Sequence, residues 1–250
     1  MMRYFIELSY DGSAYCGWQV QSSSCSVQEL LESGLRFKTA FTGRVTGCGR
    51  TDAGVHAHQF FAHFDLDKEI DTSKLSDDLN RYLPNDIAIK QIFMVNSNAH
   101  ARFDAISRTY CYYLATKKNP FMKNYVLPVH YFLNLDMMNE ASAVLMKFED
   151  FTSFSKLHSD VKTNNCMVTQ AFWRVHDEQL IFTITADRFL RDMVRAIVGT
   201  LLDVGRGKIS LTQFIDIIQN KDRRKAGISV PAHALFLEKV EYVWDKILTL

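Results

Sequence analysis

Residues 47–57 read GCGRTDAGVHA and separate two short apolar runs, at about 44–48 and 58–64. Apolar runs of this length, bounded by glycines, favour two strands joined by a connection. A simple hairpin needs only about two to five residues, so this connection is longer than a turn requires. Long loops often carry function, and its polar residues are therefore the first candidates for a site.

The surrounding sequence predicts a complete β-α-β-β-α-β unit. Residues 3–9 alternate like a strand, and residues 26–38 predict a helix in which Ser26 and Glu29 have the spacing of a capping box. A second helix is predicted over 72–83, where Pro84 ends it, and residues 87–95 form an apolar strand.

The second half of the chain repeats this order. The predicted strands cover 108–115, a hairpin over 170–186 that turns at Asp177–Gln179, and 234–243; the predicted helices cover 136–148, 188–204 and 210–219. We therefore predict an α+β fold of two ferredoxin-like halves, each an antiparallel sheet with helices on one face. The expected domains are 1–100 and 101–250, with a junction near 97–107.

Composition narrows the class of protein. With 47% hydrophobic and 23% charged residues among 250, the chain can bury a core. No apolar run approaches the roughly 20 residues of a membrane helix, and the N-terminus lacks the apolar segment of a signal peptide. The five cysteines are scattered and include no CxxC pair. This pattern favours reduced thiols in the cytoplasm and argues against structural zinc.

Asp52, beside Arg50, is the candidate reactive carboxylate. Gly47, Gly49 and Gly54 are expected to let this loop adopt positive φ angles and approach a ligand closely. A second interpretation is an irregular hairpin in which Asp52 caps a turn. Composition does not separate the two.

Arginines and tyrosines give further candidates. On a helix over 188–204, Arg188, Arg191 and Arg195 would share one stripe that could bind phosphates or hold a buried carboxylate. Ordinary ion pairs on a solvated face would also explain that stripe. Tyr110 and Tyr112 share one face of their strand, where they could stack on bases or pack in the core.

Two other constellations are weaker. His56 and His58 have a spacing that could bind metal, but the only nearby third ligand is His63, so we expect no metal site. Asp11 and Asp52 could form the carboxylate pair of a hydrolase, although nothing in their spacing requires them to lie close together.

Several ordered blocks carry a family resemblance. They read YDGSAYCGWQVQ (10–21), GRTDAGVHA (49–57), HARFDAISRTYCYYL (100–114), FLRDMVRAIVGTLLDVGRG (189–207) and VPAHALFL (230–237). In these blocks the chain resembles the tRNA pseudouridine synthase A family, from about residue 4 to 243. One departure is Ala234, which precedes Leu235 where the family usually has glycine.

The resemblance implies a role for each matching residue. Asp52 would be the essential carboxylate, Arg195 its ion-pair partner, and Tyr110 the ring that lies against the target base. Arg50 and Thr51 would shape the loop and contact RNA. Leu235 would line the substrate site.

The family resemblance also implies the partners and the reaction. The substrate would be uridine in the anticodon arm of tRNA, at positions 38–40, and the enzyme would be a homodimer. Isomerisation to pseudouridine needs no net redox change and no group transfer, so no cofactor and no metal are expected. The formal net charge is only +1. Arg188, Arg191 and Arg206 are therefore expected to gather at the RNA-binding face.

Three interpretations of function remain open at this level. The first is the isomerase, in which Asp52 attacks the ribose C1′, adds to uracil C6 or removes the 2′ proton to give a glycal. The second is a non-catalytic RNA-binding module on the same sheets. The third is a hydrolase that uses Asp11 and Asp52 together.

Overall fold

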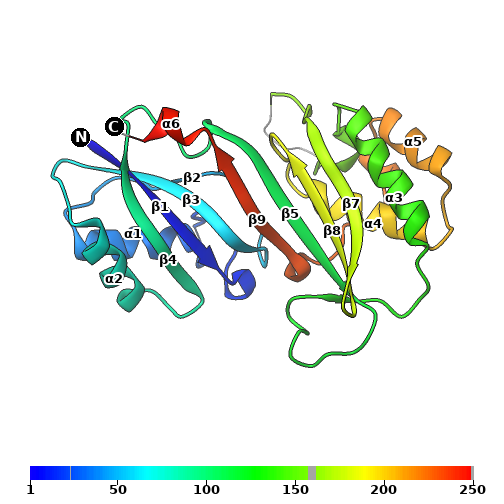
Figure 1. Cartoon of the computed structure of the whole chain (residues 1–250), viewed down its shortest axis with the longest axis horizontal. Coiled ribbons are helices and arrows are strands. Elements are labelled where there is room, and N and C mark those ends of the chain that lie inside the picture. The colour runs from blue at the N-terminus through cyan, green and yellow to red at the C-terminus, as the bar shows by residue number, and fades with distance from the viewer. Residues whose placement is uncertain (23, 157–161, 249–250) are drawn as a thin grey trace. The chain divides into compact units, whose positions relative to one another are not determined.

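The computed structural model describes residues 1–22, 24–156 and 162–248 (Figure 1). The chain divides into two compact units, Met1–Ser107 with Phe236–Leu250, and Arg108–Leu235. Both units contain strands and helices, which confirms the α+β class. The last strand was expected to complete the second half, but it is grouped with the first unit.

The first unit contains the predicted β-α-β-β-α-β order. β1 lies between β4 and β3, antiparallel to both, and β2 pairs with the far end of β3. β9 runs parallel to β3, with His56 opposite Phe236. The elements are β1 (Met2–Tyr10), α1 (Val27–Lys38), β2 (Thr46–Gly47), β3 (His56–Leu66), α2 (Thr72–Tyr82), β4 (Ile87–Val95), β9 (Leu235–Tyr242) and α6 (Trp244–Ile247).

The core of the first unit covers both faces of β1. Tyr4, Phe5 and Ile6 are fully buried in succession, so both faces of the strand are covered there. Phe5 contacts Tyr242 edge-on at 5.7 Å between ring centroids. Successive residues of a strand point to opposite faces. Because the C-terminal segment brings aromatic rings onto the sheet, the residues on both faces of β1 are buried.

The helices of the first unit begin where the sequence predicts. The Ser26 hydroxyl accepts from the Glu29 N–H at the start of α1, and the Asp71 carboxylate accepts from the Lys74 N–H at the start of α2. These side chains satisfy backbone donors that the first helical turn leaves unpaired. α1 and α2 pack on each other, and α2 packs on β4 (Figure 1).

In the second unit β8 lies between β5 and β7, antiparallel to both, and β6 pairs with the end of β5. α3 packs on β7 and contacts α4 and α5. The elements are β5 (Ala105–Ala115), β6 (Leu127–Pro128), α3 (Leu135–Val144), β7 (Val168–His176), β8 (Gln179–Ala186), α4 (Met193–Gly205) and α5 (Leu211–Gln219). Short 3₁₀ turns occur at Gly12–Ala14, Leu145–Lys147, Thr152–Phe154, Arg223–Lys225 and Ala232–Ala234.

Two predicted helices are shorter than expected. α3 ends at Val144 and tightens into a 3₁₀ turn, so it does not reach residue 148. α4 begins at Met193 rather than near 188, because Asp192 adopts a left-handed conformation with φ of 67°. That conformation cannot continue a right-handed helix. Among the described residues, no helix combines the length and apolar character needed to cross a bilayer.

Candidate active site

The loop between β2 and β3 is held by the segment that follows β1. The Trp18 N–H donates to the Thr51 carbonyl at 3.3 Å, and the Gly54 N–H donates to the Tyr15 carbonyl at 3.3 Å. The hydroxyls of Tyr10 and Thr51 share a hydrogen bond of 2.8 Å. These contacts bracket Asp52 on both sides, so its backbone position is set by the first loop of the chain.

Two glycines of that first loop permit the close approach. A Cβ atom on Gly12 would lie 2.1 Å from the Val55 carbonyl oxygen. A Cβ atom on Gly17 would lie 2.3 Å from the Thr51 carbonyl oxygen, and Gly17 has a φ of 90°. The two glycines of YDGSAYCG therefore serve the loop that carries Asp52.

The glycines of the Asp52 loop itself serve different purposes. Gly54 adopts a φ of 79°, as predicted. Gly47 and Gly49 are absent from the residues with positive φ, so that part of the prediction is wrong. A Cβ atom on Gly47 would meet the Trp18 ring at 2.6 Å, so Gly47 is needed for packing. A Cβ atom on Gly49 would meet nothing within 4 Å.

His56 and Asp11 link the same two loops. The His56 Nδ1 accepts from the Gly12 N–H at 3.0 Å and lies 3.0 Å from an Asp11 carboxylate oxygen. The buried imidazole stacks on Phe236 at 4.4 Å. Asp11 also caps the Ser13 N–H at 2.9 Å. These contacts give Asp11 a structural role, so its presence does not require a hydrolase mechanism. Within the described ranges, no group of three or more potential ligands could hold a metal ion.

Arg195 lies on the first turn of α4 in the second unit. Its Nε donates to the Val230 carbonyl at 2.7 Å, and its Nη1 lies 3.0 Å from the Asp192 carboxylate. Arg223 also approaches Asp192, at 3.9 Å, and the Ser229 hydroxyl donates to it. Asp192 therefore orients the Arg195 guanidinium from the turn that precedes the helix.

The predicted arginine stripe is wrong as a helical feature. Only Arg195 of the three lies on α4, because Arg188 and Arg191 precede the helix. The Arg188 Nη1 donates to the Thr163 carbonyl at 3.3 Å. Arg206 follows the end of α4, and its guanidinium lies 4.4 Å from the centre of the Tyr131 ring.

The two tyrosines of β5 differ in environment. Tyr110 is partly exposed and meets Phe189 edge-on at 5.0 Å. Tyr112 is buried and its hydroxyl donates to the Pro231 carbonyl at 2.9 Å, so Tyr112 is a core residue. Burial raises the pKa of Tyr112. Leu235 begins β9 with 5% of its surface exposed.

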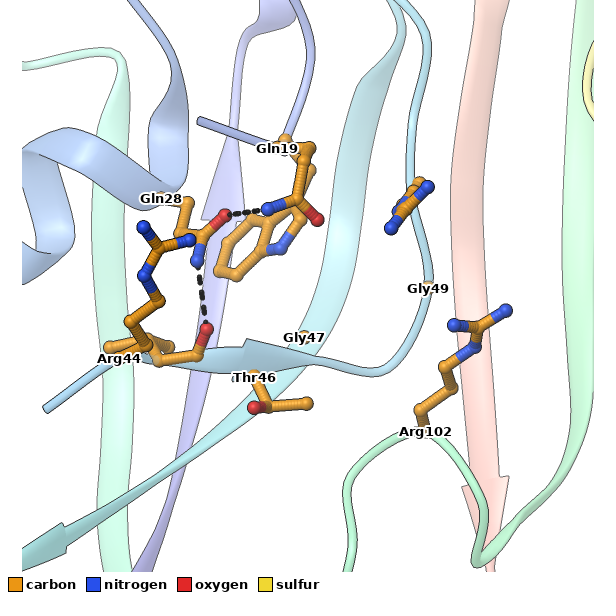
Figure 2. Close-up of a pocket in the computed structure, with 10 residues that line it drawn as sticks. Gln19, Gln28, Arg44, Thr46, Gly47, Gly49 and Arg102 are labelled. Carbon is orange, nitrogen blue, oxygen red and sulfur yellow. Dashed lines mark hydrogen bonds between the residues drawn. The ribbon is translucent and has the colours of Figure 1, made fainter. Parts of the chain in front are cut away.

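An open pocket of about 210 Å³ adjoins the Asp52 loop (Figure 2). Arg44, Arg50 and Arg102 line it, together with polar side chains of Gln19, Gln28 and Thr46. The sequence alone singled out neither Arg44 nor Arg102. Arg102 lies within the block HARFDAISRTYCYYL, which was a usable signal, whereas Arg44 is an isolated arginine before an apolar run.

The rest of the predicted site is divided between the two units. Asp52, Arg50 and Thr51 belong to the first unit, whereas Tyr110, Arg195 and Leu235 belong to the second. The predicted pairing of Asp52 with Arg195, and the place of Tyr110 against a base, therefore stay predictions.

Comparison with known proteins places the chain in a family. Residues 148–243 match the family model described as tRNA pseudouridine synthase. The chain is 53% identical to tRNA pseudouridine synthase A of Porphyromonas gingivalis, over 99% of this chain and 100% of that protein. It is 53% identical to that of Parabacteroides distasonis, over 97% and 96% of the two chains. It is 52% identical to that of Bacteroides fragilis, over 97% of each. The chain therefore belongs to the tRNA pseudouridine synthase A family.

Proposed function

We propose that this protein converts uridine to pseudouridine in the anticodon arm of tRNA, at positions 38–40, with Asp52 as the reacting carboxylate. Pseudouridine synthases are isomerases: the N–C glycosidic bond breaks, the uracil rotates, and a C–C bond forms. The observation that best supports Asp52 is its loop, which is held at Thr51 by Tyr10 and Trp18 and at Gly54 by Tyr15, on either side of Asp52. Such preorganisation is what a positioned reactive group requires.

The chemistry gives each proposed residue a task. Asp52 acts as an anion, whether it attacks C1′, adds to C6 or removes the 2′ proton. Arg195 supplies the cation that favours the ionised carboxylate in a dry site. The Tyr110 ring stacks on the base, and its hydroxyl exchanges the C5 proton. The target nucleotide leaves the helical stack, which costs about a few kcal/mol.

Asp52→Asn is expected to abolish pseudouridine formation while tRNA binding stays near the wild-type level, because the amide keeps the shape and loses the charge. The measurement is tritium release from C5-labelled uridine in unmodified tRNA, alongside a binding titration. Wild-type turnover in this variant would refute the role of Asp52. Binding without any tritium release by the wild-type protein would favour the RNA-binding module, and cleavage products would favour the hydrolase.

We also infer that the enzyme works as a homodimer in the cytoplasm. All five cysteines carry free thiols, three of them buried, which suits a reducing compartment. Dimerisation rests on the family resemblance. Sedimentation equilibrium measures it directly, and a single monomeric species at micromolar concentration would contradict it.

A further inference from the structure

The strongest unassigned feature is the arginine-lined pocket beside the Asp52 loop. We propose that it is a subsite for one backbone phosphate of the RNA, next to the nucleotide that reacts. This inference rests on the proposed function, and it adds Arg44 and Arg102 as binding residues.

The charge of the pocket favours an anion. Three arginines line it, with Arg44 and Arg102 on different sides (Figure 2), and among the described residues no aspartate or glutamate does. Arg44 and Arg50 are exposed, and neither forms an ion pair with a described acidic residue within 4.0 Å. Guanidinium forks match phosphate oxygens in geometry as well as charge. A pocket with this lining is suited to a phosphate.

One wall of the pocket is rigid. The Gln28 side chain is 3% exposed, and its Oε1 accepts from the Gln19 Nε2 at 2.8 Å. Its Nε2 donates to the Val45 carbonyl at 2.9 Å, so Gln28 ties the Gln19 segment to the residue that follows Arg44 (Figure 2). The buried Trp18 ring packs against Gly47 and stacks on Phe60 at 4.1 Å.

The turn that carries Arg102 is also fixed. The Arg3 Nη1 donates to the Ala99 carbonyl at 2.8 Å, and the Tyr242 hydroxyl donates to the Ala101 carbonyl at 2.6 Å. The Ala101 N–H donates to the His63 Nδ1 at 3.1 Å. Arg102 therefore extends from an anchored backbone, and Figure 2 shows its guanidinium beside Gly49 while that of Arg44 lies beside Gln28.

The volume of the pocket and its distance from Asp52 favour a single phosphate of the RNA backbone as the ligand. At about 210 Å³ the pocket is smaller than the roughly 300–1,000 Å³ of sites for whole small molecules, and it suits a phosphate with part of its ribose. Arg50 lies two residues before Asp52, a span of at most about 7 Å. A phosphate held here would fix the strand next to the reacting nucleotide.

The test pairs a change in the protein with a change in the RNA. Synthetic anticodon stem-loops each carry one neutral methylphosphonate in place of a phosphate, and they bind to proteins in the Asp52→Asn background, where no turnover occurs. We expect one position to weaken binding about tenfold with intact arginines, because a charge-assisted hydrogen bond is removed there. The same position is expected to have a much smaller effect on the Arg44→Gln/Arg102→Gln double variant, in which only Arg50 of the three arginines remains.

The matched control is Arg81→Gln, an exposed arginine of α2 in the same unit, which should respond to the neutral linkage like the parent. Equal weakening of the parent and the double variant at every position would overturn the subsite, as would a double variant that binds unmodified RNA as tightly as the parent. Thermal melting checks that the variants fold. Failure of the proposed function is separate, because it appears as wild-type protein that releases no tritium.

Discussion

At the scale of single residues, the position of the Asp52 loop depends on two glycines that have no side chain to block it. Gly12 and Gly17 leave room for the carbonyls of Val55 and Thr51, and no other residue type leaves that room. Both positions therefore require glycine, since any side chain at either one displaces the loop that carries Asp52. The glycines of YDGSAYCG are therefore explained by close packing, without any chemical role.

Gly17→Ala tests this dependence. The left-handed backbone and the 2.3 Å approach of the Thr51 carbonyl oxygen are expected to cost more than about 2 kcal/mol of unfolding free energy and to reduce turnover strongly. Urea unfolding and tritium release are the two measurements. Gly49→Ala is the control for stability, because a Cβ atom there meets nothing within 4 Å and the φ angle is not positive. Equal unfolding free energies for the two variants would contradict the argument.

At the scale of elements, the sequence predicted strands and helix starts better than helix extents. β4 covers 87–95 as predicted, and Ser210 forms a capping box with Gln213 at the start of α5. Periodicity and capping signals are local, so one sequence contains them. The first turn of α4 fails this logic because Asp192 is bound by Arg195, Arg223 and Ser229, and two of these three residues come from a distant segment.

The candidate site was predictable only where its chemistry was local. The GRTDAGVHA motif, through the family resemblance, predicts Asp52 as the reacting carboxylate, and that role stays a prediction. The pocket beside it brings residues 19, 28, 44 and 102 together, and no spacing rule links positions that far apart. The anchoring of the turn at 99–104 by Arg3 and Tyr242 cannot be predicted from sequence for the same reason.

The turn that carries Arg102 should respond to pH through His63. Burial, with the Arg3 charge nearby, lowers the pKa of His63 to about 4. The unfolded chain, with an ordinary pKa near 6.5, binds the proton first, so stability is full above about pH 6.5 and falls as pH drops toward 4. Between pH 7.5 and pH 5 the free energy of unfolding is therefore expected to fall, by at most about 2 kcal/mol for this one group once solvent screening is allowed for.

Urea unfolding of the wild type and of His63→Gln, at both pH values, measures this effect. His63→Gln should lose most of the difference, whereas His176→Gln, an exposed histidine on the β7–β8 hairpin, should keep it. The same pH dependence in His63→Gln as in the wild type would show that other groups cause it.

At the scale of the whole molecule, the net charge is only +1. Binding to an RNA polyanion therefore requires positive side chains gathered on one part of the surface. Arg188, Arg191 and Arg206 are proposed to face RNA, so affinity for tRNA should fall linearly on a plot of log affinity against log salt. Replacing all three by glutamine is expected to reduce the slope by about 0.7–0.9 for each phosphate that is no longer neutralised. Arg224→Gln is the control, because Arg224 is paired with Asp222 at 2.9 Å. A slope that the triple variant leaves unchanged would remove these residues from the interface.

The place of β9 has a consequence for biosynthesis. Phe236 and its strand partner β3 are separated by most of the described polypeptide, and the ribosome makes β9 long after β3. The intervening unit can finish folding first, while the neighbour of the Asp52 loop still lacks the ring that stacks on His56. A nascent chain therefore lacks the Phe236 ring beside His56 until that strand has been synthesised and has paired with β3.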